Sequence, residues 1–234
     1  MLLLAQANYR YMRLFLSSFF LYLLIVFNTA FGEALQKEYN VKVSGLKIGK
    51  LKWKVEINEE EYLNEINLKS EGVLSALYRF EGKYFSKGFI QDKELHPTNY
   101  SHFWKTNKTS KNMNLAFKDG KLLSLKQTPV EEERLRINVF NINKNKDPLT
   151  SFLQLINGKK SSLVVDGRRV YKMNAIFDNK TNQTVVQISD YFNLWADHKR
   201  SNFEKIIFEK INDSLLPIKI NIYFDGRVFK LEKI

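Results

Sequence analysis

The sequence contains no cysteine and only three histidines among its 234 residues. The absence of cysteine excludes disulfides, thiolate metal sites, a cysteine nucleophile and lipid attachment to cysteine. His96, His102 and His198 have no further ligand at a metal-binding spacing, so the sequence predicts neither a metal site nor a cofactor. Low-complexity tracts, long linkers and convincing repeats are also missing, which favours a single folded domain after the N-terminal segment.

Catalytic motifs are absent as well. Ser101-His102 and Asp197-His198 offer the residue types of a triad without a nucleophile-elbow pattern, and Glu131–Glu133 form a run typical of a solvated loop. Gly45 and Gly49 precede a strand, whereas a phosphate-binding loop must open a helix. We therefore expect no catalytic residue and a non-catalytic function. The alternative is a periplasmic hydrolase whose site is scattered over strand ends.

The N-terminal segment has the three parts of a secretory signal. Arg10 and Arg13 are its positive region, residues 14–27 are almost wholly apolar, and Ala30-Phe31-Gly32 offers small residues for cleavage before Glu33. The segment predicts a signal peptide over residues 1–32 and a periplasmic protein. The alternative is an uncleaved N-terminal membrane anchor, because about 18 apolar residues are the lower limit for spanning.

The remaining chain, residues 33–234, is predicted to be one β-rich domain. Met12 followed by Arg13 gives a more compact signal, so we expect Met12 to be the true start.

The formal net charge of the whole chain is +12, and basic residues are dispersed along strands. This charge suits an anionic membrane surface or solubility alone. Dispersed charge on an exported chain argues against nucleic acid as a partner.

The clearest strand runs from Lys50 to Ile57. Leu51, Trp53 and Val55 alternate with Lys50, Lys52 and Lys54, which predicts an antiparallel strand with one apolar and one charged face. The three lysines are our candidates for contact with an anionic envelope surface. Their alternative role is to protect a solvated strand edge from pairing.

The helical period occurs clearly in one place, residues 148–156. Leu149, Phe152, Leu153 and Ile156 fall on one helix face. Asp147 is placed to cap the helix, Pro148 suits its first turn and Gly158 can end it.

Elsewhere the pattern is strand after strand. Asp119-Gly120, Asp166-Gly167 and Asp225-Gly226 predict three hairpins, over residues 112–126, 162–177 and 218–231. Pro97 is expected to end a strand. Ten to twelve strands in one sheet tend to curl. The predicted fold is therefore all-β with minor α: a single antiparallel rolled sheet, half-barrel or barrel, with the short helix plugging or covering an opening.

The order of these landmarks resembles the bacterial exported proteins of the domain of unknown function 3108 family. It runs from Gly45-Leu46-Lys47-Ile48-Gly49 and the Trp53 strand through Pro97, Asp147-Pro148-Leu149 and Asp166-Gly167-Arg168 to Leu216-Pro217-Ile218. The resemblance covers the chain from about Glu38 onward. It implies export and a barrel-like or rolled-sheet fold. It implies no activity, cofactor or catalytic residue for any position.

The many aromatic residues have two possible roles. Trp53, Trp104 and Trp195, with 18 phenylalanines and 11 tyrosines, either fill a core or line a surface for a lipid-like molecule. We take the three tryptophans as candidate ligand-binding residues. The sequence as a whole predicts an exported envelope protein that binds a lipid-like or polymeric envelope component or assists envelope assembly. A further possibility is pairing with another envelope protein through a strand edge.

Overall fold

The structure is a computed structural model that describes residues 33–72, 75, 79–195, 203–211 and 214–234. The expected signal peptide, Met12, Asp197 and His198 lie outside these residues.

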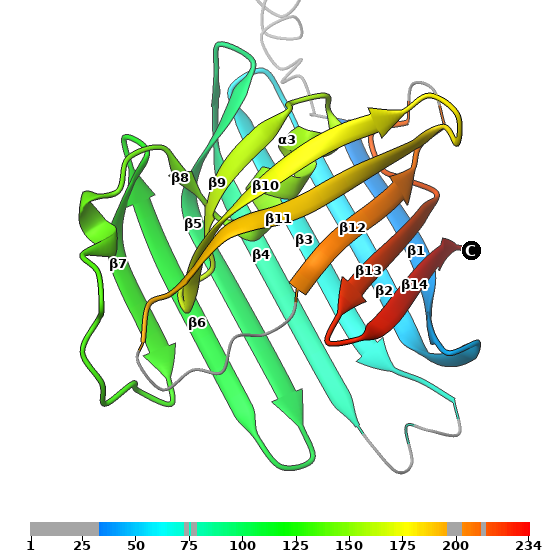
Figure 1. Ribbon diagram of the computed structural model, residues 1–234, viewed down its shortest axis with the longest axis horizontal. Helices are drawn as coiled ribbons and strands as arrows, with labels where there is room; N and C mark the ends of the chain where they lie inside the picture. The colour runs from blue at the N-terminus through cyan, green and yellow to red at the C-terminus, as the bar shows by residue number, and fades with distance from the viewer. Residues whose placement is uncertain (1–32, 73–74, 76–78, 196–202, 212–213) are drawn as a thin grey trace, which may run out of the picture. The chain divides into compact units, whose positions relative to one another are not determined.

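Fourteen strands form one sheet (Figure 1). Seven precede the helix: β1 (Glu33–Val43), β2 (Leu46–Ile57), β3 (Glu61–Ser70), β4 (Phe80–Gln91), β5 (Glu94–Thr106), β6 (Ser110–Lys118) and β7 (Lys121–Thr128). After η1 (Val139–Asn141) come β8 (Asn145–Lys146), α3 (Pro148–Ile156), β9 (Ser161–Val165), β10 (Arg169–Asp178), β11 (Gln183–Asn193), β12 (Phe203–Glu209), β13 (Lys219–Phe224) and β14 (Arg227–Lys233).

The sheet closes on itself almost completely. Its strand order is β7-β6-β5-β4-β3-β2-β1-β14-β13-β12-β11-β10-β9-β8, with β1 and β14 joining the two halves and β8 parallel to β9. The edge strands β7 and β8 approach each other at one end. There Lys121 bridges Asn143, and the Asn145 N–H donates to the Gly120 carbonyl at 3.2 Å. The prediction of a barrel-like all-β fold with one short helix is confirmed, although the number of strands exceeds our ten to twelve.

The three Asp-Gly hairpins form where the sequence predicts them. They join β6 to β7, β9 to β10 and β13 to β14. Asp119, Gly120, Asp225 and Gly226 have φ between 50° and 71°, a region in which glycine and aspartate are tolerated. At the remaining turn the Asp166 carboxylate accepts hydrogen bonds from the Arg168 and Arg169 N–H groups.

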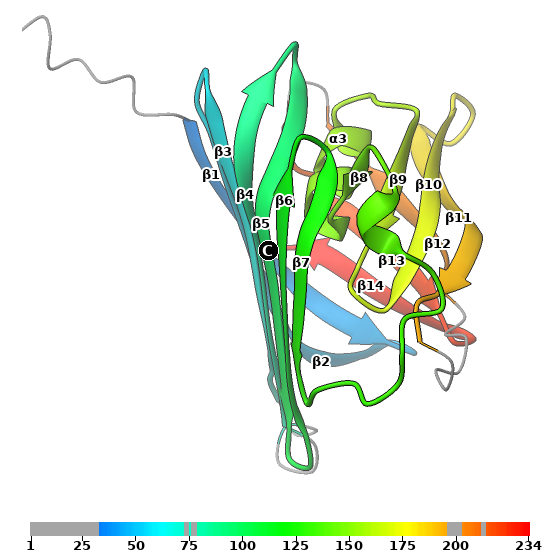
Figure 2. The same ribbon diagram turned by 90° about the vertical axis from the view of Figure 1, so that its left-hand side faces the viewer.

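The predicted helix also forms, and it lies inside the barrel. Figure 2 shows α3 between the wall of β1–β7 and the wall of β9–β12. The Asp147 carboxylate caps it by accepting from the Leu149 and Thr150 N–H groups, and Gly158 follows its end at φ 93°. Every residue from Leu149 to Ile156 is buried, so the helix fills the space that the curled sheet encloses.

Two apolar clusters meet at this helix. One contains Phe152, Leu153, Leu155 and Ile156 together with inward side chains of β1, β2 and β10–β14. The other contains Leu149 with inward side chains of β5–β7, β9 and β10. Among the described residues no helix is long and apolar enough to cross a membrane.

The expectation that Pro97 ends a strand is wrong, since Pro97 lies within β5. It pairs with Gly88 of β4, where the register of the two strands shifts. Proline has no N–H for a regular ladder, and bulges are the places where a sheet accepts it. The strand therefore continues past Pro97 to Thr106.

A buried lysine beside α3 leads to a pH-dependent prediction. Lys146, whose side chain is 8% exposed, donates to Glu94, to the Leu95 carbonyl and to Gln154. The Lys159 ammonium donates to the Glu94 carboxylate at 2.6 Å and is the main cause that lowers the pKa of Glu94 to about 2. A lowered folded-state pKa stabilises the fold above the ordinary value of 4.5, and this stability is lost as pH falls from 4.5 toward 2.

We therefore expect Glu94→Gln to lower the free energy of unfolding by about 1 kcal/mol at pH 7, a value kept small by the 45% exposure of Glu94. The difference from wild type should vanish toward pH 2. Urea unfolding across this range measures it. Glu56→Gln, which removes a pair that is 40% exposed on both sides, is the control and should cost less. A difference that is independent of pH would contradict the prediction.

Candidate functional site

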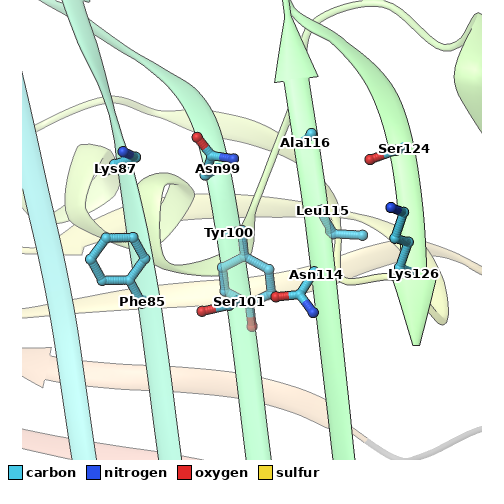
Figure 3. A pocket seen from close by; sticks show the side chains of 10 residues that line it. All are labelled: Phe85, Lys87, Asn99, Tyr100, Ser101, Asn114, Leu115, Ala116, Ser124 and Lys126. Carbon is cyan, nitrogen blue, oxygen red and sulfur yellow. The ribbon is translucent and has the colours of Figure 1, made fainter. Parts of the chain in front are cut away.

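An open groove lies on the outer face of the wall formed by β1–β7, which we call the first wall. It has a volume of about 440 Å³, opens to solvent, and crosses β4, β5, β6 and β7. Its lining is Phe85, Lys87, Asn99, Tyr100, Ser101, Asn114, Leu115, Ala116, Ser124 and Lys126. Tyr100 and Leu115 are buried toward the inside of the barrel, so they supply the floor, and the other side chains are on the outer face (Figure 3).

Strand register explains why these side chains meet. One cross-strand row is Phe85, Ser101, Asn114 and Lys126, and the next row is Lys87, Asn99, Ala116 and Ser124. Directly paired residues of neighbouring strands have Cβ atoms about 5 Å apart. The small residues Ser101, Ala116 and Ser124 sit between the longer ones and leave the surface hollow. Lys87 and Lys126 stand at opposite ends (Figure 3).

The polar groups of the groove are available to a ligand. In the part of the chain that the structure describes, the side chains of Asn99, Ser101, Asn114, Ser124 and both lysines have no hydrogen bond or ion pair. Amides and hydroxyls supply both donors and acceptors, and lysine supplies donors with a positive charge. Neither a carboxylate nor a histidine lines the groove, so its two serines have no neighbour of either type to act as a general base.

A second hollow, of about 300 Å³, lies beside the β10–β11 turn. Its polar lining is already engaged. Glu209 accepts from Gln183 at 2.6 Å and lies 3.5 Å from the Lys219 ammonium, while Lys210 donates to the Ile156 carbonyl. We therefore take the outer groove as the candidate site.

The tryptophans predicted to bind a ligand do not come together. Trp53 is 1% exposed, stacks on Phe152 of α3 and donates its indole N–H to Asn64 at 2.7 Å. Trp195 is 7% exposed and donates to the Gly167 carbonyl at 3.2 Å. These two belong to different apolar clusters.

Trp104 lies in neither cluster. Its half-buried ring stacks on Phe80, with centroids 5.6 Å apart, and covers Gly82 of the paired strand. An aromatic ring over a cross-strand glycine protects backbone that has no side chain of its own. A ligand-binding role for the three tryptophans stays a prediction.

The three lysines of β2 lie on the outer face, each near a carboxylate. The pairs are Lys50–Glu71 at 3.7 Å, Lys52–Glu38 at 3.1 Å and Lys54–Glu56 at 2.5 Å. These partners reduce the positive potential that an anionic surface would meet. Contact between this face and an anionic envelope surface remains a prediction.

The histidines of the described chain are stacked on aromatic rings. His96 stacks on Phe89, and His102 stacks on Tyr84 with centroids 4.4 Å apart. Burial lowers the pKa of His102 to about 4, so its imidazole is neutral at pH 7. The described residues include no group of three or more His, Cys, Asp or Glu that could hold a metal ion.

One buried cluster contains residue types that are common in catalytic sites, but its hydrogen bonds hold the start of α3 against the sheet. Asp147 accepts from the Ser86 and Thr150 hydroxyls at 2.9 and 2.5 Å, and Tyr62 contacts Thr150 at 2.6 Å. Burial raises the pKa of the Asp147 carboxyl, and these hydrogen bonds oppose that shift. Because all four side chains are buried, no substrate reaches them, and the cluster joins α3 to β3 and β4.

Sequence reasoning missed the groove. Its residues lie on four strands with no motif within any of them, and only the cross-strand register brings them together. The available signal was weak: Asn99, Ser101, Asn114, Ser124 and Lys126 alternate with apolar neighbours and so could be assigned to an outer face.

The fold defines the class to which this protein belongs. It is an all-β domain built as a nearly closed antiparallel barrel around an internal helix, with no established activity. The family model described as "Protein of unknown function (DUF3108)" matches residues 38–191, and the chain belongs to this family. The family resemblance seen in the sequence is thereby confirmed.

Two further comparisons complete these findings. The solved structure titled "Crystal Structure of Beta-barrel-like Protein of Domain of Unknown Function DUF1849 from Brucella abortus" is similar to this chain. Its identity is 12%, the match covers 87% of this chain and 96% of that one, and the TM-score is 0.48. No curated protein matches the chain.

Proposed function

We propose that this protein is an exported, non-catalytic component of the cell envelope that binds a polymeric envelope component in the outer groove. One observation carries the proposal: the groove combines unpaired amides, hydroxyls and lysines on a rigid sheet. The sheet fixes the backbone positions of these groups, so their spacing is set before a ligand binds.

The lipid-like ligand that the aromatic content suggested has less support. The space inside the barrel holds the side chains of α3, and Trp53 packs directly on Phe152. The apolar surface of the groove comes from Phe85, Ala116 and the floor residues Tyr100 and Leu115, and it is too small to cover an acyl chain. A polymer that is rich in hydroxyl or charged groups matches the lining better.

The alternative of a periplasmic hydrolase lacks a supporting observation. A hydrolase site would place a histidine or carboxylate within about 3 Å of a nucleophile in an accessible cleft. The groove contains serines without such a partner, and the Ser86–Asp147 contact is buried. Non-catalytic binding is therefore the function that the geometry favours.

The cellular location is part of the proposal. It rests on the signal-like residues 1–32, which predict a cleaved periplasmic protein, or an anchored one if cleavage fails. N-terminal sequencing of the protein from fractionated cells tests this. A mature chain that begins at Glu33 in the periplasm supports cleavage, and an intact chain in the membrane supports the anchor. Recovery from the cytoplasm contradicts the proposal.

The groove is tested with a variant that fills it. Ala116 is one of the small residues that leave the groove hollow, so Ala116→Phe should reduce binding to insoluble envelope fragments about tenfold, the effect of about 1.4 kcal/mol of lost contacts. Gln187→Phe adds the same ring to an exposed position of β11 on the other wall and should bind like wild type. Co-sedimentation measures both, and circular dichroism checks folding. The proposal fails if wild type does not sediment or if both variants bind equally.

A further inference from the structure

We infer that the groove selects an acidic glycan, a chain of sugars that bears repeated negative charges. This inference rests on the proposed function and names its ligand class. Two features carry it: the separation of the two lysines, and the mixture of amide, hydroxyl and aromatic groups between them.

The two lysines stand at positions that suit two separate anionic groups. Lys87 is on β4 and Lys126 on β7, three inter-strand steps away, which is about 14 Å at ordinary strand spacing. They also stand in different rows, which adds to the separation. A phosphate or carboxylate has one charged group to place at these lysines, whereas a chain with several anionic groups can place a separate one at each.

The charge between and around these lysines favours an anion. No acidic residue lines the groove. The neighbouring carboxylates are on β3, outside the groove: Glu65 is paired with Phe85 and accepts from the Asn67 amide at 2.7 Å, and Glu61 is paired with Phe89. Unlike the lysines of β2, Lys87 and Lys126 have no ion-pair partner in the described chain.

The groups between the lysines fit sugars better than peptides or lipids. Asn99, Asn114, Ser101 and Ser124 each both donate and accept, as sugar hydroxyls require of their partners. Phe85 adds an apolar surface for the face of a sugar ring. An extended peptide would instead satisfy its backbone along a strand edge, and the groove crosses the faces of four strands.

Calorimetric titration of the purified protein tests the inference with defined probes. Oligogalacturonate is the acidic glycan, and maltooligosaccharide of matched length is the neutral one. Galacturonate monomer and polyphosphate separate the contributions of length and charge. We expect oligogalacturonate to bind most tightly, with an affinity that falls as salt is raised.

Charge-removing variants locate the effect. Lys87→Gln and Lys126→Gln should each weaken oligogalacturonate binding about two- to fivefold, as expected for exposed ion pairs, and the double variant about tenfold. Lys172→Gln removes an exposed lysine from β10 on the other wall and should leave the affinity unchanged. Loss of affinity in all three single variants would show a general charge effect and overturn the assignment to the groove.

The remaining outcomes separate the inference from the proposed function. Equal binding of the neutral and acidic glycans, or binding of polyphosphate alone, overturns the acidic-glycan inference. If Ala116→Phe still reduces sedimentation with envelope fragments, the proposed function survives that result. If neither glycans nor envelope fragments bind wild type, both fail.

Discussion

Asp147→Ala is expected to lower the free energy of unfolding by about 3 kcal/mol. The lost N-cap costs about 1 kcal/mol, and the buried hydroxyls of Ser86 and Thr150 lose their acceptor at about 1 to 3 kcal/mol. These hydrogen bonds join α3 to the wall of the barrel as well as starting the helix. Urea unfolding followed by circular dichroism measures the change.

Asp178→Ala is the matched control. Asp178 also accepts a backbone N–H and a threonine hydroxyl, from Lys180 and Thr181, but in an exposed turn where water replaces them. Its loss should cost much less than the loss of Asp147. Asp147→Asn keeps the acceptor for the helix N–H groups and should fall between the two. Equal costs for the two alanine variants would show that burial of the Asp147 cluster contributes nothing.

Gly88→Ala is expected to lower the free energy of unfolding by more than about 3 kcal/mol. No other single added methyl group in the first wall should cost as much. A Cβ at this position would lie 1.9 Å from the His96 carbonyl oxygen and 2.8 Å from the Pro97 Cα. Both neighbours are backbone atoms of the paired strand, so the collision can be relieved only if β4 and β5 move apart at their bulge. Thermal or urea unfolding measures the cost.

Gly82→Ala provides the comparison on the same strand and the same face. There a Cβ meets the rings of Trp104 and Tyr84 at 3.1 Å, and a side chain can shift where backbone cannot. We expect about 1 kcal/mol of destabilisation at Gly82. If Gly82→Ala proves as costly as Gly88→Ala, the close approach of backbone at the bulge is not what requires glycine.

Features that depend on a few consecutive residues could be predicted from the sequence. The helix is one: Asp147 as a cap, Pro148 in the first turn and an apolar face at helical spacing all lie within ten residues. The Asp-Gly hairpins are another, because a tight turn needs residues that tolerate positive φ. Alternation over β2 likewise placed Trp53 inside and the lysines outside.

Features that depend on pairing between distant strands could not be predicted. Pro97 remains in a strand because Gly88, nine residues earlier, faces it at a bulge. The polar residues Tyr62, Ser86 and Asp147 are buried because the sheet brings them together around the helix end. Asp147 has a local pattern only as a helix cap, and the other positions have none that differs from an ordinary strand.

The sequence by itself determined the elements of this protein: strands with one apolar face, a capped helix, three hairpins and the absence of a catalytic motif. The tertiary structure decided where the helix sits and where a ligand can bind. The reason is physical. Turn and helix preferences act through neighbouring residues, whereas the groove arises from the register of β4 to β7, and that register follows from how the entire sheet curls and buries its inner face.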